Sequence, residues 1–276
     1  MELQNQNIAI IGGGESGVGA ALLAKKMGAS VFVSDAGLLK DQYRKELEDQ
    51  GIDFEESSHD MKRLSNARWV VKSPGIPSSA PIIQELKALE LNIISEIEFA
   101  SNFTDATKIC VTGSNGKTTT TMLLYHIFKK AGLNVGFAGN VGKSLARQVA
   151  ASKMDYFIIE LSSFQLDDLQ DFKADISILL NITPDHLDRY ENNMSLYADS
   201  KMRITNNQEK QDWFIYNADD PVINQKVASM TLPMKVASFS IKAPQPIGGY
   251  LKSEELIINI KEQLTMSIHD LALKGK

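Results

Sequence analysis

The hydrophobic and polar positions of this chain fall into short apolar runs that alternate with longer amphipathic stretches. Short apolar runs between polar or glycine turns are typical of buried strands, whereas amphipathic stretches that end at glycine are typical of helices. Strands are predicted at residues 8–11, 30–34, 69–71, 92–94, 109–111, 156–160, 176–180, 213–216, 256–260 and 264–268. Helices are predicted at residues 16–27, 42–50, 81–89 and 117–131, and from residue 193 or 195 to about 207. The alternation predicts an α/β fold with largely parallel sheets.

Two domains are expected in this chain. Its 276 residues are more than a single hydrophobic core comfortably organises. A polar segment at residues 101–107 lies between two series of predicted strands and helices. We therefore predict one domain at residues 1–105 and a second at residues 106–276.

Composition and charge exclude several classes of protein. The hydrophobic fraction of 43% and the charged fraction of 23% are those of a globular chain. The formal net charge of −5 argues against a nucleic-acid or anionic-membrane partner. The start of the chain has no secretory leader pattern, and no stretch approaches the ~18 apolar residues of a membrane span. The single cysteine, Cys110, fits a reducing compartment. We expect a cytoplasmic protein that binds neither nucleic acid nor membrane.

The strongest motif lies at residues 112–119 (TGSNGKTT), between a predicted strand and a predicted helix. This is the context of a phosphate-binding loop, because backbone N–H groups and a helix N-terminus attract phosphate oxygens. Lys117 would reach the outer phosphates, and the Thr118 hydroxyl would bind Mg²⁺. The strict Walker spacing requires a glycine where this chain has Val111, so the loop is a shorter variant. An ordinary glycine turn is the alternative, and the Gly-Lys-Thr sequence argues against it.

A second motif consists of Gly12, Gly14 and Gly17, with Asp35 at the end of the next predicted strand. This spacing is a dinucleotide fingerprint in which the acid binds a ribose. The same turn can hold any diphosphate, because a helix N-terminus recognises the anion and not the base. The motif alone therefore leaves open NAD, a nucleotide-linked substrate and a turn without a ligand.

Glu160, His186 and Lys201 form a third candidate group. Glu160 ends a predicted strand, and His186 follows the next one. The C-terminal ends of strands in an open α/β sheet line the ligand crevice, so both side chains would face bound phosphates. A carboxylate and an imidazole are acceptable Mg²⁺ ligands beside ATP, although Mg²⁺ prefers oxygen. By themselves, the histidine would be a polar loop residue and the lysine a solvated charge. Asp219 and Asp220 predict a turn and a helix start, without chemistry.

Four segments of the chain resemble the Mur ligases, at residues 113–119, 160–166, 181–190 and 217–220. Within that family, the second of these segments and residues 73–77 (SPGIP) resemble members that add D-glutamate to UDP-N-acetylmuramoyl-L-alanine. The resemblance extends over essentially the whole chain. It implies a Rossmann-like first domain that binds the UDP end of the substrate, followed by a central P-loop-type ATPase domain with a mostly parallel sheet. It also implies an ATP-driven reaction through an acyl phosphate, in peptidoglycan precursor synthesis, with a monomer as the expected state.

The resemblance implies a role for each matching residue. ATP would be bound by Gly113, Ser114, Asn115, Gly116, Lys117, Thr118 and Thr119. The catalytic residues would be Lys117, Glu160, His186 and Lys201. Two Mg²⁺ ions are implied, one held by Thr118 and Glu160 and one by His186 and a carbamylated Lys201. The UDP substrate would be bound by Glu15, Ser16, Asp35, Ser73, Pro74, Gly75, Asn140, Ser162 and Gln165.

Two departures from the family pattern limit these expectations. Ala36 and Gly37 follow Asp35, so side-chain contacts that relatives can make to uracil are missing here. Members of the family continue into a third domain that carries much of the D-glutamate site, so we expect residues 1–276 alone not to make the product. One alternative is an NAD-dependent oxidoreductase built on the first glycine turn, which the second phosphate loop disfavours. The other is a non-catalytic nucleotide-binding module.

Overall fold

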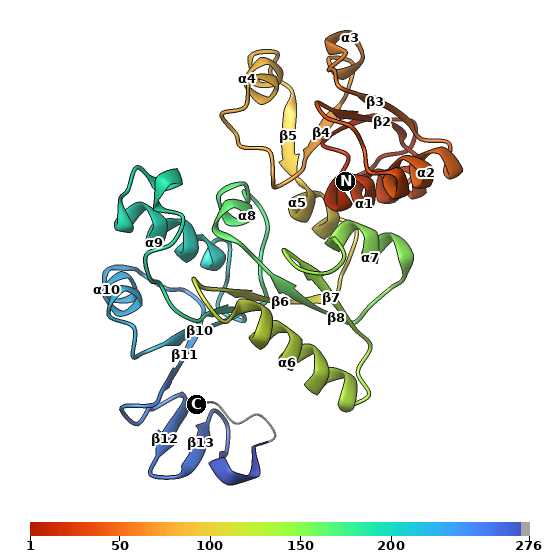
Figure 1. Cartoon of the computed structure of the whole chain (residues 1–276). Coiled ribbons are helices and arrows are strands. Elements are labelled where there is room, and N and C mark those ends of the chain that lie inside the picture. The colour runs from red at the N-terminus through yellow and green to blue at the C-terminus, as the bar shows by residue number, and fades with distance from the viewer. Residues whose placement is uncertain (272–276) are drawn as a thin grey trace. The chain divides into compact units, whose positions relative to one another are not determined.

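The computed structural model describes residues 1–271 and has an α/β fold with mostly parallel sheets (Figure 1). The chain divides into two compact units. The first unit consists of Met1–Thr107 and Thr121–Phe172, and the second of Lys108–Thr120 and the chain from Lys173 onward. Compact units of this kind need not fold independently, so the predicted domains at residues 1–105 and 106–276 stay a prediction. No helix within residues 1–271 is long and apolar enough to cross a bilayer.

The first unit contains a five-stranded parallel sheet of the Rossmann type, with strand order β3-β2-β1-β4-β5. Its strands are β1 (Asn7–Ile11), β2 (Ser30–Asp35), β3 (Asp53–Glu56), β4 (Trp69–Lys72) and β5 (Asn92–Ser95). Its helices are α1 (Glu15–Lys26), α2 (Asp41–Asp49), α3 (Met61–Leu64), α4 (Pro81–Ala88) and α5 (Glu96–Ser101). The strand order changes direction between β1 and β4, whose C-terminal residues Ile11 and Lys72 are paired. Loops that leave such a switch point diverge and open a ligand crevice.

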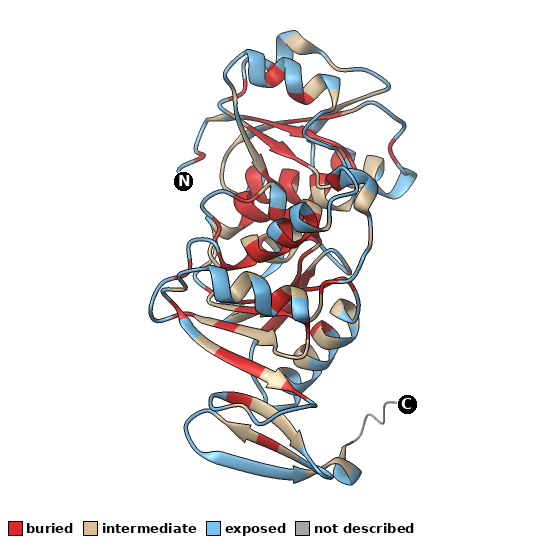
Figure 2. Cartoon of the chain, turned by 90° about the vertical axis from the view of Figure 1, so that its left-hand side faces the viewer, coloured by how far each residue is buried: buried red, intermediate tan, exposed pale blue. Residues whose placement is uncertain are grey.

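Apolar side chains bury the central strand β1 on both faces, as a parallel sheet covered by helices requires. Ile8, Ile10 and Ile11 are all almost completely buried. On the neighbouring helix α1, Val18 and Leu23 are fully buried. Figure 2 shows the buried residues, in red, gathered on the strands and on the helices that cover them.

Besides most of α6 (Lys117–Lys130), the rest of the first unit consists of a parallel strand pair and the helices next to it. The elements are β7 (Val135–Gly139), β8 (Tyr156–Glu160), α7 (Leu145–Ala151) and α8 (Ser163–Asp167). Helix α7 packs against α1 and α5. The buried Glu96 carboxylate accepts a hydrogen bond from the Ala146 N–H at the start of α7, at 2.6 Å. Burial raises the pKa of this carboxyl group to about 7, against the opposing effect of the hydrogen bond.

The second unit is organised around a run of strands in the order β14-β13-β12-β11-β10-β9-β6. The strands are β6 (Thr107–Thr112), β9 (Ile176–Leu179), β10 (Trp213–Asn217), β11 (Lys235–Ser240), β12 (Gly248–Lys252), β13 (Glu255–Asn259) and β14 (Gln263–Ser267). The pairs from β6 to β12 are parallel, and the last three strands are antiparallel. The described helices are α9 (Met194–Met202) and α10 (Pro221–Ser229), with short 3₁₀ turns at Leu187–Tyr190, Arg203–Thr205 and Ile268–Asp270. The predicted α/β fold is therefore confirmed.

The predicted strands and helices are all present, with ends shifted by a few residues, but several elements had no prediction. These are β3, β7, β11 and β12, and the short helices α3, α5, α7 and α8. Strand β3 (DFEE) is an acidic edge strand, and β12 (GGYLK) begins with two glycines, so neither has an apolar run. The hydrophobic pattern after residue 221 is also weak, so the sequence does not predict β11 and β12, which pair through backbone hydrogen bonds.

Candidate functional site

A cavity of about 650 Å³ lies at the switch point of the five-stranded sheet. Its lining residues are Gly12, Gly14, Glu15, Ser16, Asp35, Ala36, His59, Ser73, Pro74, Gly75, Ile76, Ala80, Pro81 and Ile82. All six residues of the predicted UDP-substrate set that precede residue 105 are among them. The cavity combines polar groups at the strand ends with an apolar wall from residues 76 and 80–82, which suits a planar base and its phosphates.

Asp35 braces the first glycine turn. One carboxylate oxygen accepts a hydrogen bond from the Gly13 N–H at 2.6 Å, and the other accepts one from the Gly37 N–H at 2.8 Å. Gly17 lets α1 approach this turn, because a Cβ atom there would lie 1.7 Å from the Gly12 carbonyl oxygen. The glycine spacing thus follows from close packing, and the predicted role of Asp35 at a ribose stays a prediction.

Glu15 lines the cavity with its charge compensated. Its Oε1 accepts hydrogen bonds from Arg147 Nε at 2.7 Å and from the Ser144 N–H at 3.1 Å. Arg147 also forms a bidentate ion pair with Glu46. A carboxylate held in this way repels an entering diphosphate less than an unpaired one would.

His59 is a cavity residue without any signal in the sequence, since it lies in a loop outside every motif. Its Nδ1 lies 2.6 Å from the buried Ser34 Oγ, and the Ser34 hydroxyl donates to Glu55 Oε1 at 2.7 Å. Serine has one hydroxyl hydrogen, and the carboxylate takes it, so Nδ1 must be the donor to Oγ.

The remaining predicted substrate residues of the first unit gather where β8 ends. Glu160 is 1% exposed and accepts a hydrogen bond from Asn140 Nδ2 at 2.9 Å. Ser162 and Gln165 form a capping box at the start of α8, in which each side chain bonds to the other residue's backbone. The structure therefore brings Asn140 next to Glu160 and Ser162 next to Gln165.

The predicted phosphate loop follows β6 and leads into α6 (Lys117–Lys130). Gly116 has φ of +81°, a left-handed conformation that favours glycine. The Lys117 ammonium group donates to the carbonyl oxygens of Gly113 at 2.8 Å and Ser114 at 2.9 Å. Lys201 Nζ, at 1% exposure, donates to the same Gly113 oxygen at 2.9 Å. Two ammonium groups therefore converge on the carbonyls of this loop.

The segment after β9 supports the back of the phosphate loop. Asn181 accepts the Asn115 N–H through Oδ1 at 2.8 Å, and its backbone carbonyl accepts the Ser114 N–H at 2.9 Å. The Ser114 hydroxyl lies 2.9 Å from the Thr183 carbonyl oxygen and 3.1 Å from the hydroxyl of the buried Tyr197. The Tyr197 ring also lies 4.6 Å from Lys201 Nζ. Two motifs that are far apart in the sequence thus form one hydrogen-bonded structure.

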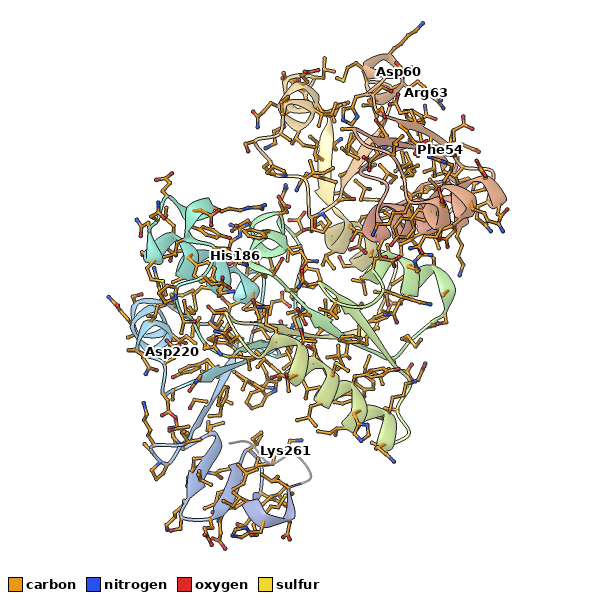
Figure 3. All side chains as sticks on the ribbon, viewed as in Figure 1. Phe54, Asp60, Arg63, His186, Asp220 and Lys261 are labelled. Carbon is orange, nitrogen blue, oxygen red and sulfur yellow. The ribbon has the colours of Figure 1, made fainter. Side chains whose placement is uncertain are left out.

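His186 and Asp220 are labelled in Figure 3 and lie on connections that follow β9 and β10. His186 has left-handed backbone angles and a side chain that is 59% exposed. Asp220 caps α10 with Oδ1, and its Oδ2 accepts the Ile182 N–H at 2.8 Å. The predicted turn and helix start at Asp220 are confirmed, and the bond to Ile182 is an additional role.

No three histidine, cysteine, aspartate or glutamate side chains gather into a metal-binding cluster within residues 1–271. The Mg²⁺ ligands implied by the resemblance include a hydroxyl group and a modified lysine, so they are not a cluster of histidine, cysteine and carboxylate side chains. Thr118, Glu160, His186 and Lys201 stay predicted ligands.

Two protein-family models match the chain. Residues 111–271 match the model of the Mur ligase middle domain. The chain belongs to the Mur ligase family. Residues 7–82 match the model of the MurD N-terminal domain. Both models describe parts of ligases, so neither the NAD-dependent oxidoreductase nor the non-catalytic module is supported.

Similar curated proteins have one name in common. A UDP-N-acetylmuramoylalanine–D-glutamate ligase of Bacteroides fragilis is 51% identical over 271 residues, which is 98% of this chain and 61% of that protein. The protein of that name from Porphyromonas gingivalis is 50% identical over 278 residues, which is 100% of this chain and 62% of that protein. The chain thus spans about three-fifths of the length of these relatives.

Solved structures confirm the fold. A UDP-N-acetylmuramate:L-alanyl-γ-D-glutamyl-meso-diaminopimelate ligase of Neisseria meningitides matches 95% of this chain and 84% of its own, with a TM-score of 0.66 and 20% identity. A murein peptide ligase of Psychrobacter arcticus matches 98% of this chain and 62% of its own, with a TM-score of 0.64 and 20% identity. At this identity the likeness concerns the fold alone.

Proposed function

We propose that this chain carries the nucleotide-binding machinery of an ATP-dependent ligase. The enzyme joins D-glutamate to UDP-N-acetylmuramoyl-L-alanine in peptidoglycan precursor synthesis. The observation that carries the proposal is the 51% identity, over 98% of this chain, to a relative named for that reaction. The presence of a crevice at a Rossmann switch point and a separate phosphate loop in one chain supports it.

The first predicted domain, residues 1–105, binds the UDP end of the substrate in the cavity of about 650 Å³. The N-terminus of α1 and the glycine turn meet the diphosphate, because backbone N–H groups and the helix dipole attract anions. Asp35 lies at the ribose, and the apolar wall with Ile76 and Ile82 packs against the base. Asn140, Ser162 and Gln165 contact the sugar and the attached diphosphate.

ATP is bound at residues 113–119. In the described state Lys117 is held by two carbonyl oxygens of the loop. Phosphate oxygens carry more negative charge than carbonyl oxygens, so the ammonium group moves to the γ-phosphate when ATP binds. The loop N–H groups and the N-terminus of α6 receive the remaining phosphate oxygens.

The reaction takes place in two steps. The carboxylate of the alanyl residue attacks the γ-phosphorus atom, which forms an acyl phosphate and releases ADP. The amine of D-glutamate then attacks the acyl carbon, which forms the amide bond and releases inorganic phosphate and a proton. Lys117 stabilises the charge that develops on the transferred phosphoryl group, where electrostatic positioning supplies most of the rate enhancement.

Two Mg²⁺ ions and a modified lysine complete the proposal. The Thr118 hydroxyl and the Glu160 carboxylate are oxygen donors of the kind that Mg²⁺ prefers. An unmodified Lys201 ammonium group does not fit a metal, because its positive charge repels the ion. Addition of CO₂ to the neutral amine releases a proton and gives a carbamate, whose oxygens suit Mg²⁺ beside His186. A cytoplasmic location and a monomeric state are part of the same proposal.

A product assay tests this function. The full-length enzyme that contains this chain is incubated with ATP, Mg²⁺ and UDP-N-acetylmuramoyl-L-alanine, with each candidate amino acid supplied in turn, and products are identified by mass spectrometry. The proposal expects an amide product with D-glutamate and equimolar ADP and phosphate. A product with another amino acid in preference to D-glutamate would refute the assigned substrate.

A further inference from the structure

Lys72 and Asp168 form a buried ion pair in the first unit. Lys72 is the last residue of β4, and Asp168 is the C-cap of α8. The distance from Nζ to Oδ2 is 2.6 Å, and the side chains are 4% and 15% exposed. Removing both charges from water costs several kcal/mol, roughly as much as their attraction returns, so such a pair is weak evidence of a gain in stability. The role of the ion pair is therefore better explained by the two segments that it holds together.

One end of the pair holds the loop that forms a wall of the nucleotide cavity. Lys72 precedes Ser73, Pro74 and Gly75, which line the cavity, and its Nζ also donates to the Ile76 carbonyl oxygen at 2.7 Å. The loop is fixed to the sheet separately, because the Ser73 N–H donates to the Ile11 carbonyl oxygen at 3.0 Å.

The other end of the pair holds the segment proposed to contact the sugar. Asp168 Oδ1 accepts a second hydrogen bond from Ser78 Oγ at 3.2 Å, so the two carboxylate oxygens bind the end of β4 and the loop that follows it. Helix α8 has only five residues, from Ser163 to Asp167, and starts at the Ser162–Gln165 capping box. This short helix connects Asp168 directly to Ser162 and Gln165, so a shift of Asp168 also shifts those two residues.

We propose that Lys72 and Asp168 are positioning residues that set the distance between the two halves of the UDP-sugar site. The pair fixes residues 73–78 to the C-terminal end of α8, so that one ligand contacts the cavity wall and the Ser162–Gln165 turn together. Preorganisation of this kind increases affinity by removing the ordering cost from the binding step. The inference rests on the proposed function, since it requires a ligand that extends from a nucleotide to an attached sugar.

A purely structural role makes a different prediction. If the pair only stabilised the fold, its loss would weaken UDP and the whole UDP-sugar by the same factor. If the pair positions the two segments, its loss should weaken binding of the UDP-sugar more than binding of UDP. UDP contacts only the cavity, and the cavity wall remains attached to β1 through Ser73. The ratio of the two affinities therefore separates the two roles.

The experiment compares Lys72→Met, Asp168→Asn and the double variant Lys72→Met/Asp168→Leu by titration calorimetry with UDP and with UDP-N-acetylmuramoyl-L-alanine. Asp168→Asn keeps the hydrogen bond from Lys72 to Ile76, so it is expected to bind the UDP-sugar about tenfold more weakly and UDP within about twofold of the parent, as lost preorganisation predicts. The two variants with Lys72→Met lose that bond as well, and they should still lose more affinity for the UDP-sugar than for UDP. The double variant replaces the pair by apolar side chains, which often preserves stability. It should therefore recover the melting temperature but not the affinity ratio.

The matched control is Arg63→Met, which breaks the exposed Arg63–Asp53 pair in the same unit and should leave both affinities unchanged. The inference is overturned if the variants bind the UDP-sugar normally, or if both ligands weaken equally in the stable double variant. Failure of the parent protein to bind the UDP-sugar, in contrast, would overturn the proposed function itself.

Discussion

The chain contains two glycine turns at strand–helix junctions, and they are stabilised by groups of opposite charge. In the first, the Asp35 carboxylate accepts the N–H of Gly13. In the second, the ammonium groups of Lys117 and Lys201 donate to the carbonyl oxygen of Gly113. One turn is thus fixed by an anion on its donors, and the other by cations on its acceptors.

This difference bears on what each turn can bind. The carboxylate at the first turn remains on the protein as a hydrogen-bond acceptor, which suits the hydroxyl groups of a ribose beside the diphosphate. At the second turn, the Lys117 ammonium group can transfer from carbonyl oxygens to the outer phosphates of a triphosphate. These contacts support the proposal that the first turn binds a diphosphate-linked nucleoside and the second a triphosphate.

The largest expected effect is that of removing the transferable cation. In the full-length enzyme, Lys117→Ala should lower ATP turnover by about 100-fold or more, because phosphoryl transfer depends on electrostatic positioning. The fold should persist, since Lys117 is partly exposed and donates to carbonyl oxygens of its own loop. Lys130→Ala, at the other end of α6, is the control. Normal ATP turnover in Lys117→Ala would remove this residue from its assigned role.

Replacing Lys201 tests whether its role differs from that of Lys117. In the full-length enzyme, Lys201→Ala should reduce activity by at least about 10-fold, because even the loss of a residue that only supports a metal ligand costs about 10- to 100-fold. A short carboxylic acid added to the variant should restore part of the activity, because it replaces the carbamate oxygens. Activity equal to that of the parent, with no response to the acid, would contradict carbamylation.

Neutralising the anion of the first turn should have a smaller effect, limited to the uridine ligand. Both Asp35 oxygens accept backbone hydrogen bonds, and an amide can accept through only one of them. Asp35→Asn should weaken UDP binding by about tenfold, equivalent to the loss of about one hydrogen bond. ATP binding should not change. Equal losses for both nucleotides would show that the turns are not independent, and the exposed Asp41→Asn controls for charge alone.

Replacing Glu96 should have the smallest effect on function, but it should change how the stability of the protein depends on pH. Burial raises the pKa of Glu96 to about 7, so the folded state holds the proton more tightly than the unfolded chain does. The contribution of this proton to the free energy of unfolding is therefore lost as pH rises from about 4.5 to about 7. Glu96→Gln should therefore be more stable than the parent at about pH 8, by roughly 3 kcal/mol, and gain much less at about pH 5.

Urea unfolding at both pH values measures this difference, with the exposed Glu48→Gln as the control. Nucleotide affinities should be unchanged in Glu96→Gln, since neither turn involves Glu96. A gain in stability that is equal at the two pH values would show that the carboxyl group does not titrate as described.

Much of the fold follows from local sequence signals. The apolar run of β1, the glycine turn before α1 and the Asn193 cap of α9 each act within a few residues, so the sequence alone predicts them. The phosphate loop was predictable for the same reason, because strand, turn and helix are contiguous from β6 to α6.

The unpredicted features depend on contacts between distant residues. Lys72 and Asp168 are 96 positions apart, and only the folded chain shows that a lysine at a strand end is paired. His59 becomes a cavity residue because β2 and β3 are neighbours and Ser34 holds its ring. The acidic strand β3 pairs with the edge of β2, and its carboxylates Glu55 and Glu56 accept hydrogen bonds from the distant residues Ser34 and Arg44.

Simultaneous binding of two nucleotides is the most direct test of the assignment of the two turns. The protein is first saturated with UDP-N-acetylmuramoyl-L-alanine and then titrated with ATP and Mg²⁺ in a calorimeter, and NAD is titrated separately. One ATP should bind per chain in the presence of the UDP-sugar, without competition between the two ligands, and NAD should bind more weakly than either. Competition of ATP with the UDP-sugar for one site, or NAD binding as tightly as the UDP-sugar, would contradict this assignment.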